Sequence, residues 1–143
     1  MRKTILVLLA LGALLALAAP ASAADTALIA RLSGKAEKMP PGDKNGRGIA
    51  TVILDDSADQ VCFALAWNKI GVPVAAHIHK GRAGVSGPIV VPFFNGTPVK
   101  AGCVSASHSL IKKIKKRPQK YYVNIHTAAF PVGAVRGQLS KLK

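Results

Sequence analysis

Three histidines form the residue pattern in this sequence that is best suited to chemistry. His77 and His79 lie two positions apart in an apolar segment, so in an extended strand their side chains leave the same face. His126 lies in a second extended segment, residues 121–126, on the same face as Asn124. If the two segments are neighbours, three imidazoles converge. Three nitrogen ligands of this kind suit copper or zinc.

A polar network explains the same histidines without a metal. In that interpretation each imidazole hydrogen-bonds loop backbone and holds the turn that follows its strand. Arg136 fits either interpretation, since its guanidinium can bind a carboxylate of a ligand or the backbone carbonyls of two loops. The sequence leaves these alternatives open, together with a site for some other ligand. His108 precedes a predicted helix, and we expect it in solvent.

The segments that must position these residues have the period of strands. The pattern is clearest at residues 61–67, where large apolar side chains alternate with small ones. Glycine, proline, asparagine and aspartate separate such segments at regular intervals. We therefore expect an all-β fold of seven or eight strands, either a Greek-key β-sandwich or a small closed barrel. Two prolines predict that residues 88–94 form either an edge strand or an irregular extended segment, and we expect Trp67 at the centre of the core.

One segment departs from this period and predicts a short helix. Residues 109–116 carry Leu110, Ile111 and Ile114 at helical spacing, with Ser109 as the expected N-cap. The rest of the segment is basic, and the cationic set is Lys112, Lys113, Lys115, Lys116 and Arg117, extended by Lys120.

Two interpretations of this basic set remain open. It binds an anionic surface, such as lipid headgroups or cell-envelope polymers, or it is a solvated face. Nucleic acid is a poorer match, because no aromatic residues interleave with the charges to stack on bases.

The N-terminus predicts export. Arg2 and Lys3 precede an apolar stretch at residues 5–19, and Ala21-Ser22-Ala23 is a small-residue cleavage site. We expect residues 1–23 to be a signal peptide and residues 24–143 to form one secreted or envelope-associated domain. The net charge of the chain is +14, and +12 remains without Arg2 and Lys3. No later segment predicts a transmembrane helix.

The two cysteines, Cys62 and Cys103, predict a disulfide, because an even count in an exported domain usually means pairing. Buried free thiols are the alternative. The sequence has no nucleophile elbow and no phosphate-binding glycine loop. It also has only six acidic residues. These features predict that the protein is not an enzyme.

Two motifs, in order, resemble the chordin-type (CHRD) domain. The first is Ala-His-Ile-His-Lys-Gly at 76–81, followed by a matching segment at 84–88. The second is Tyr-Val-Asn-Ile-His-Thr at 122–127, followed by a matching segment at 131–139. Residues 32–34 and 40–41 also resemble the first strand and turn of that domain. The resemblance implies a secreted or surface Greek-key β domain, and its motif positions here are His77, His79, Asn124, His126 and Arg136. Ala134 stands where an acidic residue is common in the family. A local carboxylate–arginine pair is therefore not expected.

Two functional hypotheses follow. The first is a non-enzymatic extracellular binding or adhesion module whose basic face associates with an anionic envelope or extracellular component. The alternative is a copper- or zinc-binding exported protein that uses His77, His79 and His126, with or without weak redox activity.

Overall fold

The computed structural model describes residues 25–38 and 40–142, so the predicted signal peptide lies outside the described residues. Within these ranges no helix is long and apolar enough to cross a membrane. The elements are β1 (Thr26–Ser33), η1 (Gly34–Ala36), β2 (Arg47–Asp55), β3 (Gln60–Asn68), β4 (Pro73–Lys80), β5 (Ile89–Asn95), β6 (Ala101–Ser105), α1 (His108–Lys116), η2 (Pro118–Lys120), β7 (Tyr121–Thr127), β8 (Phe130–Gln138) and β9 (Ser140–Lys141).

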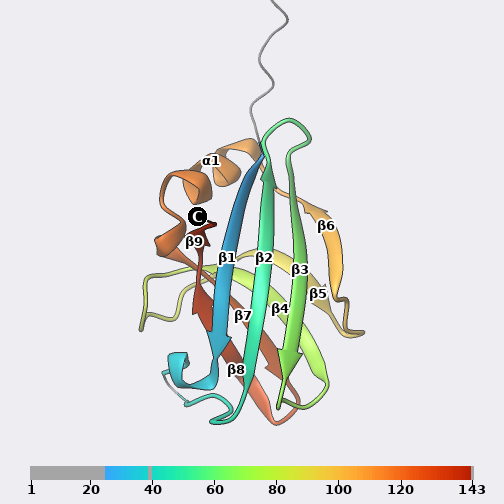
Figure 1. Cartoon of the computed structure of the whole chain (residues 1–143), viewed down its shortest axis with the longest axis vertical. Coiled ribbons are helices and arrows are strands. Elements are labelled where there is room, and N and C mark those ends of the chain that lie inside the picture. Colours follow the sequence, from blue (N-terminus) through green and yellow to red (C-terminus); the bar gives the residue numbers. More distant parts are fainter. Residues whose placement is uncertain (1–24, 39, 143) are drawn as a thin grey trace, which may run out of the picture.

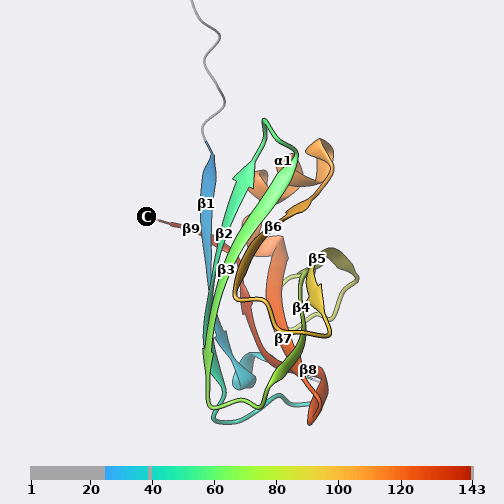
Figure 2. The ribbon, with the colours of Figure 1, turned by 90° about the vertical axis from the view of Figure 1, so that its right-hand side faces the viewer.

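The described strands form one antiparallel sheet that bends back on itself. Its order is β5-β4-β7-β8-β1-β2-β3-β6, and β9 pairs with β1. Strands β1, β2 and β3 form one layer, and β4, β7 and β8 cross behind it in a second (Figures 1 and 2). Phe63 of β3 stacks on Phe93 of β5 with ring centroids 4.3 Å apart, which brings the two ends of the sheet together. The result is a nearly closed barrel with one short helix, as the sequence predicts.

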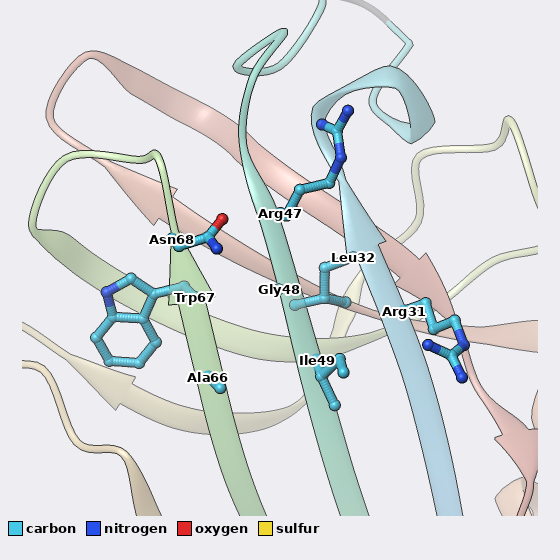
Figure 3. A pocket seen from close by; sticks show the side chains of 8 residues that line it. All are labelled: Arg31, Leu32, Arg47, Gly48, Ile49, Ala66, Trp67 and Asn68. Atoms are coloured by element: carbon cyan, nitrogen blue, oxygen red, sulfur yellow. The ribbon is translucent and has the colours of Figure 1, made fainter.

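The apolar core fills the space between the two layers. Alternate residues of each strand supply it, and α1 closes one end with Ile111 and Ile114, both fully buried. The prediction for Trp67 was wrong, because β3 continues past the end of the core. Trp67 is half-buried at the rim, with the Lys100 Nζ 5.5 Å from its ring centroid, and it lines a surface pocket (Figure 3).

Helix α1 begins slightly before the predicted position. Its N-cap is Ser107, whose hydroxyl accepts a hydrogen bond from the Leu110 N–H at 3.4 Å, so the expectation of Ser109 as N-cap was wrong. Both serines suit the cap chemically, but the helix starts at His108. Most of the basic set points outward, whereas the Lys115 Nζ lies 2.7 Å from an Asp56 carboxylate oxygen in the turn between β2 and β3.

The predicted disulfide is present. Cys62 of β3 and Cys103 of β6 are directly opposite in the ladder, with Cα atoms 3.9 Å apart. The bond therefore attaches the five-residue edge strand β6 to the main sheet. Since the cysteines are 41 positions apart, it also closes a long loop of chain.

Replacing both cysteines should lower the free energy of unfolding. Closing a loop of this length contributes about 4 kcal/mol in the chain-entropy model. We expect Cys62→Ala/Cys103→Ala to lose most of that in urea denaturation, and wild type under reducing conditions should behave like the variant. An unchanged midpoint in both experiments would contradict the assigned role.

Candidate metal-binding site

The predicted site residues lie on the face of the β4–β7–β8 layer that points away from the apolar core. Ile78, Val123 and Val135 point into the core and are fully buried. Because strand side chains alternate, their neighbours point outward. In the register, His77 is opposite Asn124, which is opposite Arg136. The pairing thus brings all five predicted residues onto one face, including His126 at the end of β7.

Two loops cover this outward face. In the segment before β2, the Asp43 N–H donates to the Ala134 carbonyl at 2.8 Å. In the segment after β4, the Val85 carbonyl accepts a hydrogen bond from Arg136 Nη2 at 2.9 Å. As a result, Asn124 and Arg136 are only 2% exposed. The site is therefore a polar layer buried beneath loops.

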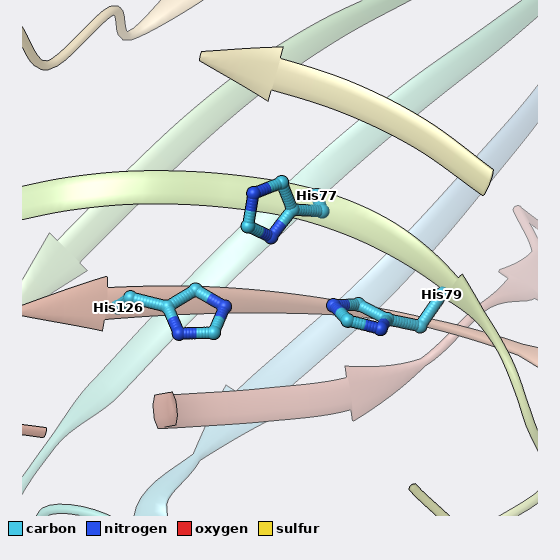
Figure 4. Close-up of side chains that lie close together, drawn as sticks. All are labelled: His77, His79 and His126. Atoms are coloured by element: carbon cyan, nitrogen blue, oxygen red, sulfur yellow. The ribbon is translucent and has the colours of Figure 1, made fainter. Parts of the chain in front are cut away.

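The three histidines converge within this layer. One ring nitrogen from each of His77, His79 and His126 lies within 4.8 Å of the other two (Figure 4). Three points this close lie within about 2.8 Å of a common centre, which is 4.8 Å divided by √3. Zinc–imidazole bonds are about 2.0–2.1 Å long. Small side-chain movements would bring all three nitrogens to bonding distance.

Backbone carbonyls orient two of the rings. His79 Nδ1 lies 2.8 Å from the Gly87 carbonyl oxygen, and His126 Nδ1 lies 2.9 Å from that of Pro131. A neutral imidazole has one N–H, which these carbonyls assign to Nδ1, so each Nε2 carries a lone pair. Metal-binding histidines are held in the same way. The Nε2 atoms of His79 and His126 and the Nδ1 of His77 are buried and lack a hydrogen bond of good geometry to any described residue, although the Asn124 side chain lies close enough to interact with His77 and His79.

The surroundings also keep the rings neutral. The pKa of His77 is lowered to about 4, chiefly by burial and in addition by the charges that His126 and His79 would carry, while a hydrogen bond with Asn124 opposes the shift. Burial likewise lowers the pKa of His79 and of His126. Neutral imidazoles at neutral pH are ready to bind a metal without first losing a proton.

Arg136 holds the layer together from one side. Its guanidinium carbon lies 3.6 Å from the centroid of the Tyr122 ring, and Tyr122 stacks on His79 with centroids 4.8 Å apart. Arg136 Nη2 also donates to the Arg82 carbonyl at 3.3 Å and to that of Val85. Of the two roles that the sequence left open for Arg136, the structure displays the loop-binding contacts.

Glu37 belongs to this layer and was not predicted from the sequence. Its side chain is 8% exposed, and burial raises its pKa, opposed by the charge of Arg136 and a hydrogen bond with Asn124. Gly133, at φ +152°, leaves space for it, since a Cβ there would collide with the Glu37 carboxylate. An acidic residue is common at position 134 in the family that the sequence resembles, and Ala134 stands there in this chain. Glu37 thus supplies a carboxylate to the same layer from a distant segment.

The fourth histidine lies elsewhere. His108 is exposed at the start of α1, as predicted, and its Nδ1 is 3.1 Å from an Asp59 carboxylate oxygen. It does not belong to the cluster of His77, His79 and His126, which makes it a matched control for experiments on that cluster.

Comparison with known families accounts for this arrangement of motifs. The sequence model of the CHRD domain matches residues 28–139, which include every residue of the histidine cluster. The chain belongs to the CHRD family. CHRD domains are binding-type modules and are typically extracellular, and the disulfide suits such a setting. No curated protein and no solved structure matches the chain.

The lowered histidine pKa values predict acid sensitivity of the metal-free CHRD domain. The unfolded chain binds a proton at each imidazole near pH 6.5, whereas folded His77 stays neutral until about pH 4. The unfolded state therefore binds more protons in this window, and stability falls as the pH falls from 6.5 to 4. We expect a loss on the order of 2 kcal/mol from His77, measured by urea denaturation with a chelator present.

Two variants isolate the histidine contribution. The raised pKa of Glu37 acts in the opposite sense, so total stability alone is not diagnostic. His77→Gln should flatten the pH dependence more than His108→Gln, which removes a histidine outside the cluster. Equal slopes in His77→Gln and wild type would contradict the assignment.

Proposed function

We propose that this CHRD-family protein binds a copper or zinc ion through His77 Nδ1, His79 Nε2 and His126 Nε2. One observation carries the proposal: three buried ring nitrogens, unpaired among the described residues, lie within 4.8 Å of one another. Imidazole is a preferred ligand for both metals. The predicted export signal would place the site where cells encounter these ions.

The unpaired nitrogens favour a metal over a purely structural network. Carbonyls of Gly87 and Pro131 satisfy one nitrogen of His79 and of His126, as the network interpretation predicts. A network built only for rigidity would pair the second nitrogens as well, because an unpaired buried acceptor costs about 1–3 kcal/mol. Here the three remaining ring nitrogens lie within 4.8 Å of one another (Figure 4).

The chemistry of such a centre follows from its ligand number. Three protein ligands leave a coordination position open, as in zinc sites that exchange ligands rather than in closed structural sites. His77 and His79 are each 9% exposed and His126 is half-buried, so parts of the rings reach the surface although the three nitrogens themselves are buried. These features suit a protein that takes up an ion and releases it to another ligand.

Metal titration of the purified domain tests the proposal. We expect one copper(II) or zinc ion per chain by isothermal titration calorimetry, with nitrogen couplings in the copper electron paramagnetic resonance spectrum. His77→Gln, His79→Gln and His126→Gln should each weaken affinity by about 100-fold or more, since even residues that only orient a ligand change affinity 10–100-fold.

His108→Gln is the matched control and should bind like wild type. Absence of binding in the wild-type protein would remove the proposal. Equal losses in His108→Gln and in the cluster variants would also contradict it, because binding would then not depend on the converging nitrogens.

We infer a second function for α1, which is association with an anionic envelope or extracellular surface. The helix buries Ile111 and Ile114 and exposes Lys112, Lys113 and Lys116. Arg117, directly after the helix, is exposed as well. A cationic face of this kind is attracted to anionic headgroups by about 1 kcal/mol per lysine.

Sedimentation with phosphatidylserine vesicles tests this second function. Lys112→Gln/Lys113→Gln/Lys116→Gln should lose about 3 kcal/mol of binding free energy at low salt, and wild-type binding should fall as salt rises. Lys35→Gln/Lys44→Gln/Lys69→Gln removes the same charge from exposed lysines outside α1 and should lose less. Equal losses in the two triple variants, or binding independent of salt, would contradict a role for α1.

A further inference from the structure

A small pocket lies beside β8, where η1 and the loop after β4 approach this strand. It has a volume of about 200 Å³. Ligands of drug size occupy pockets of about 300–1,000 Å³, so this pocket suits a smaller molecule. Three segments that are distant in the sequence supply its walls, which are Ala36, Lys38, Ala83, Gly84, Arg136, Gly137 and Gln138.

The guanidinium of Arg136 brings free hydrogen-bond donors to this pocket. Both N–H groups of its Nη2 are used by loop carbonyls, that of Arg82 at 3.3 Å and that of Val85 at 2.9 Å. No described residue accepts a hydrogen bond of good geometry from Nε or Nη1, which carry the remaining N–H groups. Neither nitrogen is a fully buried atom without a partner, so both keep access to a ligand.

The charge of Arg136 also lacks an ion pair. Among the described residues no carboxylate lies within ion-pair distance of the guanidinium. Glu37 acts on it only at longer range, and burial favours the neutral form of Glu37 by raising its pKa. The Tyr122 ring attracts the guanidinium, but it is not an anion. Because a buried charge without a counter-ion is costly, an anion in the pocket would be bound favourably.

The other walls favour an anion that has an apolar end. Gln138 Nε2 already lies 2.8–3.2 Å from three backbone carbonyl oxygens, so it is not free to bind a ligand. Lys38 is exposed and adds positive charge, whereas Ala36 and Ala83 present methyl groups. Phosphate and sulfate carry oxygens on every side and would place some of them against these methyl groups without hydrogen bonds. A short carboxylic acid carries oxygens at one end and hydrocarbon at the other.

We propose that this pocket binds a short monocarboxylate, such as propionate, against Arg136. The two carboxylate oxygens accept hydrogen bonds from Nε and Nη1, since a guanidinium and a carboxylate match as a planar, charge-assisted pair. The hydrocarbon end lies against Ala36 and Ala83. Arg136 then has two roles at once, because the loops use Nη2 and the ligand uses the other two nitrogens. The pocket contains no residue of the histidine cluster, so the proposal does not depend on a metal.

Titration of the purified, isotope-labelled protein with propionate tests this site by two-dimensional NMR. The Nε–H signal of Arg136 reports on the contact directly. At constant ionic strength we expect propionate to shift this signal to saturation, and propionamide, its neutral counterpart, to produce no saturable shift. Ala83→Leu fills the pocket without changing any charge, and it should weaken propionate binding about tenfold. Ala83 is exposed, so the variant should fold.

Ala58→Leu is the matched control, because it adds the same side chain at an exposed alanine in the turn between β2 and β3. It should bind propionate like wild type. Equal weakening in the two leucine variants, or no saturable shift in wild type, would overturn the site. Phosphate that binds as tightly as propionate would refute the preference for a carboxylate. Tighter binding of N-acetylglutamate amide would refute a free acid in favour of an acidic side chain of a partner protein.

Discussion

The buried guanidinium of Arg136 is the constraint on which the rest of the site depends. A charge that is 2% exposed is costly unless several partners surround it. Here the carbonyls of Arg82 and Val85, the Tyr122 ring and the carboxylate of Glu37 fill that role. These partners come from separate parts of the chain. Two loops must therefore lie over the sheet for the guanidinium of Arg136 to have all of them. The segment after β4 that accepts hydrogen bonds from Arg136 also contains Gly87, whose carbonyl orients His79.

The electrostatics of the polar layer follow from the same arrangement. The charge of Arg136 contributes to the lowered pKa of His79, so the rings stay neutral in a chain whose net charge is +14. A divalent cation would meet the same repulsion, and the energy to overcome it must come from direct bonds to nitrogen. Glu37 offsets part of the positive charge without being a member of the histidine cluster. Asn124 connects the two groups, since it interacts with Glu37 and with His77.

Local sequence patterns predicted the features that depend on one strand. The alternation of His77, Ile78 and His79 predicted that the two histidines share a face. The prolines of residues 88–94 predicted an edge strand or an irregular segment, and the structure has the edge strand β5 there. The contribution of His126 depends on the pairing of β4 with β7, which no local pattern determines. Glu37 was missed because it follows a short 3-10 turn and meets Arg136 only after long-range folding. Trp67 was misplaced because strand periodicity does not reveal where a core ends.

The short edge strand β6 has a consequence beyond stability. It covers the open edge of β3, whose alternating apolar residues would otherwise present unpaired backbone groups to other molecules. Exposed edges of this kind template pairing between chains. The bond between Cys62 and Cys103 keeps β6 in place along residues 60–64 of β3. The disulfide therefore holds a cover over a strand edge that could otherwise pair with another chain.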